Sequence, residues 1–154
     1  MTTIVEGTTQ GSGFKIGIAA ARWNQSITDR LVEGAQRRLE DLGIEDVVLM
    51  RVPGALELPL AARELAKAGC DGVVAIGAVV KGETDHYDIV VKESARGLTL
   101  ASLETGVPIT NAILAVHEYE LALARAGEGR DNKGTEAVDA VVEMASALQR
   151  LRSS

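Results

Sequence analysis

The sequence predicts an α/β fold with a parallel sheet, built as a single domain over residues 1–154. Short runs rich in Val, Ile and Ala alternate along the whole chain with longer segments whose apolar residues recur at helical spacing. No sequence repeat and no low-complexity linker interrupts this alternation. With 154 residues, of which 46% are apolar, the chain has enough material for one buried core.

Two strand–helix units are predicted in the first half of the chain. The apolar run that starts at Lys15 is the first strand, and apolar residues at helical intervals follow it as far as Gly43, a stop signal. Ser26 and Asp29 have the spacing of a capping box, which predicts where that helix begins. The second strand leads into a helix that has Pro59 near its start. The predicted strands are 15–20 and 46–52, and the predicted helices are 27–42 and 57–68.

The second half adds two strands and three helices. The glycine-flanked run of Val and Ile after Asp71 is typical of a buried parallel strand. Thr84 or Asp85 is a good N-cap for the long helix that follows it. The apolar run from Pro108 is the fourth strand. The predicted strands are 72–79 and 108–114, and the predicted helices are 85–105, 118–126 and 135–151.

Residues 1–13 are predicted to form an N-terminal arm. Thr2 to Val5 has the composition of a short strand, but no partner for it is evident within the domain. We therefore expect this strand to be added to the sheet edge of a neighbouring subunit.

The composition argues against several classes of protein. The net charge is −6 and only four residues are aromatic, so nucleic acid is not an expected partner. Cys70 is the one cysteine, which excludes an intrachain disulfide and suits a reducing compartment; its plainest role is that of a small buried residue. No apolar stretch approaches the roughly 20 residues of a membrane span. We expect a cytoplasmic protein with no membrane partner.

The segment from Gly77 to His86 has the layout of an anion site. Gly82, Glu83 and Thr84 fall between the carboxyl end of a strand and the amino end of a helix, where backbone N–H groups and the helix dipole favour a phosphate. His86 falls in the first helical turn, and a proton-transfer group beside an anion site suggests an enzyme. The segment matches neither the dinucleotide-binding fingerprint nor the P-loop. Loops that follow parallel strands open on one edge of the sheet, so we expect residues 23–24, 53–57, 79–86 and 111–114 to lie together.

Three candidates from these loops each have a structural alternative. Trp23 is suited to stack on a flat heterocycle or to pack in the core. Glu57 is suited to bind ligand hydroxyls or to interact with a helix dipole. Asn111 interrupts an apolar strand, either as a ligand contact or as a local backbone cap.

The charged candidates also have two readings. Arg125, at the end of a helix, either clamps an anion or pairs with the negative end of that helix. Lys133, in the loop 127–134, is by default a solvated charge. His86 alone would be a structural hydrogen-bonder, but the adjacent anion site favours proton transfer. His117 is assigned no role.

Six motifs, taken together and in this order, resemble those of the 6,7-dimethyl-8-ribityllumazine synthases of riboflavin biosynthesis. The resemblance covers nearly the whole chain, and the run Gly-Glu-Thr-Asp-His-Tyr-Asp is its most specific part. It implies a flavodoxin-like three-layer α/β/α sandwich around a four-stranded parallel sheet. The motifs are Arg22 to Asn24, Val52 to Pro59, Gly77 to Asp88, Gly106 to Asn111, Arg125 to Gly127 and Asn132 to Gly134.

The resemblance implies a transferase that acts at the penultimate step of riboflavin biosynthesis. It would condense 5-amino-6-(D-ribitylamino)uracil with 3,4-dihydroxy-2-butanone 4-phosphate to 6,7-dimethyl-8-ribityllumazine, releasing phosphate and water, with no metal and no organic cofactor. The resemblance also implies the contacts of each substrate part. The pyrimidine would contact Trp23, Val79, Val80 and Asn111, and the ribityl chain would contact Ala55, Leu56 and Glu57. The phosphate would contact Glu83, Thr84 and Arg125, while His86 would transfer protons and Lys133 would add a polar contact.

The resemblance also implies an assembly. The family's pocket is shared between adjacent subunits of a pentamer, and Asn111, Arg125 and Lys133 would come from the neighbour. The length of the loop 127–134 favours a sixty-subunit icosahedral capsid, with riboflavin synthase as a further partner. Because a carboxylate repels phosphate, we expect Glu83 to offer its N–H and turn its side chain to solvent.

Three other functions compete with this one. A paralogous riboflavin synthase of the same fold is less consistent with His86 and the full anion loop. A second alternative is a shell-forming scaffold, whose function would be assembly and whose pocket would be vestigial. A flavodoxin-like binding module is disfavoured because residues 22–26 lack the Ser, Thr and Gly expected around a flavin phosphate.

Overall fold

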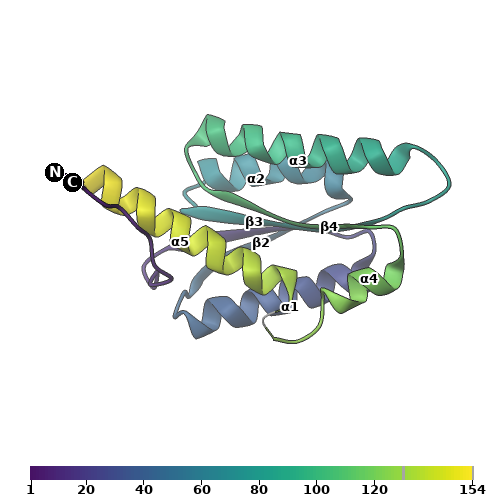
Figure 1. Ribbon diagram of the computed structural model, residues 1–154, viewed down its shortest axis with the longest axis horizontal. Helices are drawn as coiled ribbons and strands as arrows, with labels where there is room; N and C mark the ends of the chain where they lie inside the picture. The colour runs from purple at the N-terminus through teal and green to yellow at the C-terminus, as the bar shows by residue number, and fades with distance from the viewer. Residues whose placement is uncertain (130, 154) are drawn as a thin grey trace.

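The computed structural model describes residues 1–129 and 131–153 and has three layers (Figure 1). Helices α2 and α3 cover one face of the sheet, and α1, α4 and α5 cover the other (Figure 1). Within the described residues, no helix combines the length and apolar character that a membrane span requires. The elements in chain order are β1 (Lys15–Ala21), α1 (Gln25–Asp41), β2 (Asp46–Val52), the 3₁₀ turn η1 (Ala55–Glu57), α2 (Leu58–Lys67), β3 (Gly72–Val80), α3 (His86–Thr105), β4 (Ile109–Val116), α4 (Tyr119–Ala124) and α5 (Lys133–Ser153).

The sheet has four parallel strands in the order β2-β1-β3-β4. The chain steps from β1 to β2 on one side and then crosses to β3 on the other side of β1. Such a change of direction leaves a crevice between the carboxyl ends of the two central strands, which is where open α/β sheets bind ligands. The predicted α/β class and the four-stranded parallel sheet are confirmed.

Side chains of the central strands alternate between two apolar clusters. In β1, Ile16 and Ile18 point into the cluster under α1 and α5, whereas Ala19 points into the cluster under α2. This period of two is expected for strands that are covered on both faces. Gly17 lets α2 approach closely, because a Cβ there would lie 3.2 Å from Leu65 Cδ1.

Most predicted elements are confirmed, but several boundaries differ, three of them in ways that bear on the site. The capping box is wrong: α1 begins after Asn24, and Ser26 lies inside the helix, where its hydroxyl hydrogen-bonds to Tyr119 Oη. Strand β4 runs to Val116, two residues past the predicted end. Helix α5 begins at Lys133 rather than at residue 135. The last two shifts change where site residues lie.

The arm, residues 1–14, contains neither helix nor strand in the single chain. Its middle part lies along α5, since Thr8 N donates to Ser146 Oγ (3.2 Å) and Arg150 donates to the carbonyl oxygen of Glu6 (2.8 Å). The two termini therefore lie side by side (Figure 1). Ile4 is 76% exposed, and strand pairing by residues 2–5 stays a prediction that concerns a second subunit.

Candidate active site

Trp23 stands exposed at the carboxyl end of β1. Its N–H donates to the carbonyl oxygen of Pro53 (3.1 Å), which joins the loop after β1 to the loop after β2. The indole lies over Gly54, where a Cβ would be 3.4 Å from Trp23 Cε3. Because 67% of Trp23 is exposed, the core alternative is wrong, and one face of the ring is open to a flat ligand.

Asn24 connects the two central strands across the crevice. It has a left-handed backbone conformation (φ 61°, ψ 46°), and its side-chain Nδ2 donates to the carbonyl oxygen of Ala78 (2.8 Å). Pairing between β1 and β3 ends at Ile76, but β3 continues to Val80. The edge of β3 at Val79 and Val80 is therefore not covered by β1 and offers backbone groups beside Trp23.

The 3₁₀ turn η1 forms the next wall of the crevice. Glu57 Oε1 accepts a hydrogen bond from Gly54 N (3.0 Å), so this carboxylate caps the turn and is held in place by it. Glu57 therefore has a structural role, but as a cap to the N–H of Gly54 instead of a partner for a helix dipole. Ala55 is buried, whereas Leu56 and Glu57 are exposed. The turn thus presents a carboxylate of fixed position next to the indole.

The anion loop has the predicted position. Residues 81–86 are all exposed between the end of β3 and the start of the 20-residue helix α3. Asp85 is the N-cap but its side chain makes no capping hydrogen bond, and His86 N donates weakly to Thr84 Oγ1 (3.4 Å). An exposed loop that leads into a long helix is a place where backbone N–H groups and the helix dipole favour a phosphate. Glu83 is exposed, as expected.

Asn111 does not lie at the carboxyl edge. It pairs in register with Ala75, in the body of β4, so the expectation that residues 111–114 open beside the other loops is wrong. Its Oδ1 accepts from Ile113 N (2.8 Å), which is the local backbone cap; contact of this side chain with a ligand stays a prediction that concerns a second subunit. Thr110 beside it donates to the carbonyl oxygen of Ala137 in α5 (3.0 Å). Asn111 therefore belongs to the β4 side of the molecule.

Arg125 and Lys133 lie on that same side and share one carboxylate. Arg125 Nη2 is 3.7 Å from Glu136 Oε2, and Lys133 Nζ is 3.2 Å from Glu136 Oε1. Lys133 N also donates to the carbonyl oxygen of Arg125 (2.9 Å). The cluster has one more positive than negative charge. The candidates thus fall into two groups, one around Trp23 and one on the β4 side.

The remaining candidates are consistent with structural roles. Cys70 is buried, and burial raises the pKa of its thiol, which favours the unreactive neutral form. His117 stacks edge-on against Tyr87, with ring centroids 5.8 Å apart. In residues 1–129 and 131–153 there is no cluster of three or more His, Cys, Asp or Glu side chains that could hold a metal ion.

Sequence reasoning missed three contributors to the site. Asn24 was named only as part of a motif, although an Asn directly before a helix is a candidate for the left-handed conformation. Gly54 provides the surface under Trp23, and Glu136 holds the two cations; the spacing of Lys133 and Glu136, three residues apart on one helix, was the available signal.

Comparison with known proteins decides the family. The family model described as 6,7-dimethyl-8-ribityllumazine synthase matches residues 13–149. The chain belongs to the 6,7-dimethyl-8-ribityllumazine synthase family. A family member of Kineococcus radiotolerans is 47% identical over 90% of this chain and 88% of its own length. One of Thermococcus kodakarensis is 41% identical, covering 97% of this chain and 96% of its own. One of Streptomyces avermitilis is 44% identical, over 88% and 86% respectively.

The match to the lumazine synthase family includes both groups of candidate residues. Every position from Trp23 to Lys133 lies inside the matched range. The reaction of this family is therefore the basis on which we assign roles to the two groups of residues.

Proposed function

We propose that this chain condenses 5-amino-6-(D-ribitylamino)uracil with 3,4-dihydroxy-2-butanone 4-phosphate to 6,7-dimethyl-8-ribityllumazine. The observation that carries the proposal is the exposed indole of Trp23 at the carboxyl edge, tied through Asn24 to an uncovered stretch of β3 that leads directly into the anion loop. A heterocycle and a phosphate are the two features that these substrates bring. No metal or organic cofactor is needed for the reaction.

The pyrimidine occupies the part of the crevice next to Trp23. Its ring stacks on the indole and its polar edge meets the backbone of Val79 and Val80. The ribityl hydroxyls reach the turn at Ala55, Leu56 and Glu57, where one oxygen of the carboxylate is held by Gly54 N. This placement directs the reacting amine toward the anion loop.

The butanone phosphate occupies the anion loop. Its phosphate accepts hydrogen bonds from the N–H groups of Glu83 and Thr84, with the dipole of α3 behind them. The amine attacks the ketone to give an imine and water, phosphate leaves by elimination, and the ribityl-bearing nitrogen closes the second ring with loss of water. His86 moves protons in these steps, and the pocket contributes orientation and stabilisation of the departing phosphate.

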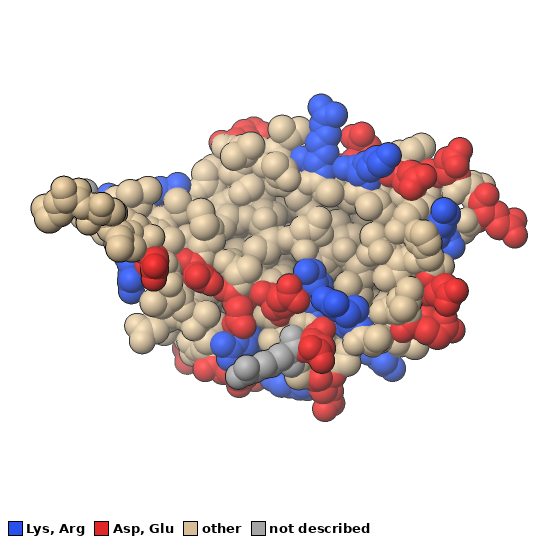
Figure 2. All heavy atoms as spheres, in the orientation of Figure 1, with Lys and Arg blue, Asp and Glu red and all other residues tan. Residues whose placement is uncertain are grey.

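The second group of residues completes the pocket of an adjacent subunit. Asn111, Arg125 and Lys133 lie on the β4 side, away from the crevice of their own chain, so we assign them to a neighbour's pocket in a homopentamer. Figure 2 supports an interface there, because the middle of the face over β4 is mostly uncharged and charged side chains gather around its rim. Ile89, Leu100 and Leu103 of α3 are also exposed, at 55%, 54% and 77%.

Further assembly follows the same reasoning. Strand β2 is the other edge of the sheet and exposes Leu49 and Met50, so it can accept residues 2–5 of a neighbour as an added strand. We propose that pentamers form a sixty-subunit icosahedral shell, with riboflavin synthase as a partner and the cytoplasm as location. Deletion of residues 1–5 should then reduce the size of the assembly in light scattering, and an unchanged size would contradict the added strand.

One assay tests the proposed reaction. The purified protein is mixed with both substrates while lumazine absorbance and phosphate release are followed, with a reaction in buffer alone as the control for uncatalysed condensation. We expect both products in equal amounts and at a rate well above the control. A rate equal to the control would overturn the proposal and leave the shell-forming scaffold. Consumption of added lumazine would instead favour the riboflavin synthase alternative.

A further inference from the structure

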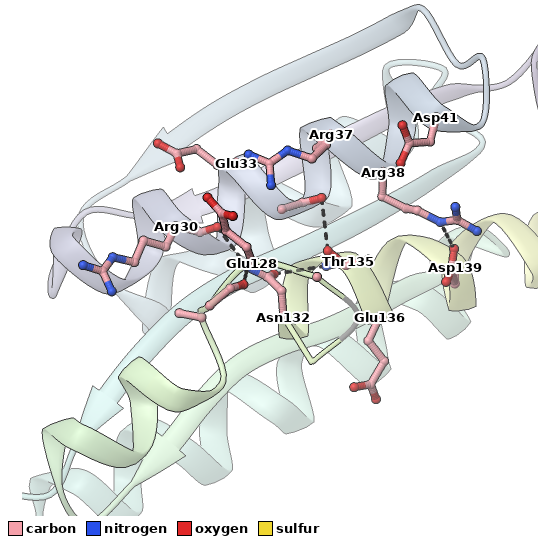
Figure 3. A pocket seen from close by; sticks show the side chains of 14 residues that line it. Arg30, Glu33, Arg37, Arg38, Asp41, Glu128, Asn132, Thr135, Glu136 and Asp139 are labelled. Atoms are coloured by element: carbon pink, nitrogen blue, oxygen red, sulfur yellow. Dashed lines mark hydrogen bonds and ion pairs between the residues drawn. The ribbon is translucent and has the colours of Figure 1, made fainter.

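Asn132 is a polar residue that is almost fully buried, with 2% of its surface exposed, and its amide uses every hydrogen-bonding group it has. Nδ2 donates to the carbonyl oxygens of Arg30 in α1 (3.1 Å) and Gly127 (2.9 Å). Oδ1 accepts from the backbone N–H groups of Gly134 (2.8 Å) and Thr135 (3.2 Å). An amide has two N–H groups and two lone pairs, so its capacity is filled. Figure 3 shows Asn132 between α1 and the start of α5.

Two glycines make room for this arrangement. A Cβ on Gly34 of α1 would collide with Asn132 Oδ1, and a Cβ on Gly134 would collide with the carbonyl oxygen of Leu31. The two helices therefore approach each other closely, with the amide of Asn132 filling the contact. Gly34 and Asn132 also line a groove of about 860 Å³, together with Arg37 and Glu128.

The segment that Asn132 holds carries both cations of the β4 side. Lys133 follows it directly as the first residue of α5, and Lys133 N donates to the carbonyl oxygen of Arg125 (2.9 Å). Glu136, which pairs with both cations, donates its N–H to the carbonyl oxygen of Asn132 (3.1 Å). In Figure 3 the Glu136 side chain points away from α1.

We propose that Asn132 is a positioning residue, which holds Arg125 and Lys133 at the spacing that the substrate phosphate in the adjacent subunit requires. The proposal rests on the proposed function, since that function assigns both cations to a neighbour's pocket, where Arg125 contacts the phosphate. Its side-chain oxygen caps the first turn of α5, and its side-chain nitrogen binds the carbonyl oxygen of Arg30 in α1. The backbone that carries the two cations is thereby held rigidly against α1.

A positioning role predicts a selective kinetic defect. The pyrimidine contacts of Trp23, Val79 and Val80 lie in the other group of residues, so a shift of the Arg125–Lys133 segment should leave them intact. Loss of Asn132 should therefore raise the KM for butanone phosphate and leave the KM for the pyrimidine nearly unchanged. A purely structural role would lower the amount of active enzyme. The apparent kcat would then fall, and neither KM would change selectively.

The test uses Asn132→Ala and Asn132→Ser in the full assembled protein. Serine keeps an oxygen that can cap α5, so we expect this variant to fold, but it loses both hydrogen bonds donated by Nδ2. We expect the KM for butanone phosphate to rise about tenfold for Asn132→Ala and about threefold for Asn132→Ser, and the pyrimidine KM to stay within about twofold. Light scattering on each variant confirms that the assembly is kept.

Two further variants separate positioning from stability and from the site assignment itself. Val142→Ala removes buried apolar atoms further along α5 without touching Asn132, and it should change neither KM selectively. Arg125→Ala tests whether the phosphate is bound by this segment at all, and it should raise the KM for butanone phosphate far more than that for the pyrimidine.

The outcomes are distinct. If Arg125→Ala raises the phosphate-substrate KM and the Asn132 variants do not, positioning by Asn132 is refuted and the proposed function stands. If Arg125→Ala has no selective effect, the assignment of this segment to the phosphate fails, and the role of Asn132 fails with it. Equal KM changes for both substrates in the Asn132 variants would also overturn positioning.

Discussion

The side-chain amide of Asn24 donates a 2.8 Å hydrogen bond to the carbonyl oxygen of Ala78, which fixes the loop after β1 to the neighbouring strand β3. Trp23 precedes Asn24, and Val79 follows Ala78. One hydrogen bond therefore sets the separation between the indole and the β3 backbone, which we propose bind the face and the polar edge of the pyrimidine.

Asn24→Gly should loosen this separation without adding backbone strain, because glycine adopts the left-handed conformation freely. We expect the pyrimidine KM to rise about three- to tenfold and the unfolding free energy to fall by about 1 kcal/mol, the worth of one hydrogen bond. Asn24→Ala should be less stable still, since alanine resists a positive φ. Steady-state kinetics and thermal melting provide both measurements. An unchanged pyrimidine KM in both variants would show that Asn24 does not set the pocket width.

Trp23 is the single tryptophan of the sequence and thus a reporter of its own pocket. A pyrimidine analogue that does not absorb at the emission wavelengths of tryptophan should quench its fluorescence in a saturable way. Trp23→Phe should preserve activity, and Trp23→Ala should weaken pyrimidine binding by about 1–3 kcal/mol, the range for an aromatic–base stack. Unchanged emission at saturating analogue, with a fully active alanine variant, would remove Trp23 from the site.

His86→Ala should lower turnover by about 10- to 1,000-fold while substrate binding is largely kept, because one proton shuttle is lost from a reaction that also proceeds unaided. Single-turnover kinetics and equilibrium binding of the pyrimidine separate the two effects. His117→Ala is the matched control, since this histidine packs against Tyr87 and has no proposed part in the chemistry. Undiminished turnover of the His86 variant would exclude it from the mechanism.

Under the proposed function, Glu136 should compete with the substrate phosphate for Arg125 and Lys133, its ion-pair partners in the single chain. Glu136→Gln should therefore lower the KM for butanone phosphate about two- to fivefold, as expected from loss of a solvent-exposed ion pair. Glu143→Gln removes the same charge further along α5 and should have no such effect. A higher KM in the Glu136 variant would instead mean that the carboxylate is needed to hold the cations in place.

The order of strands and helices could be predicted because each element carries its own signal. Runs such as Gly72–Val80 are apolar on both faces, and glycines with positive φ end α1 and α3, at Gly43 and Gly106. The start of α1 could not be predicted, because Asn24 owes its conformation in part to Ala78, 54 residues away. The capping-box spacing at Ser26 was a local signal that a tertiary contact overrode.

The site was predictable only in part, for a similar reason. The anion loop is one contiguous segment, so its geometry follows from the strand and helix around it. The exposure of Trp23 depends on Gly54 in another loop, and the position of Asn111 depends on how far β4 extends. The division of the candidates between two sides of the chain follows from the strand order, which no local pattern encodes.

The central claim is that each pocket combines the crevice of one subunit with Asn111, Arg125 and Lys133 of the next. It is tested most directly by mixing His86→Ala and Arg125→Ala subunits, dissociated and reassembled together, with each variant treated alone as the control. In a ring of equal subunits mixed at random, about a quarter of the pockets then combine an intact His86 with an intact Arg125. At a butanone phosphate concentration well below the KM of the Arg125→Ala variant, where each variant alone has low activity, the account predicts that activity rises to about a quarter of the wild-type value. Hybrid assemblies whose activity equals the mean of the two separate variants would contradict a shared pocket.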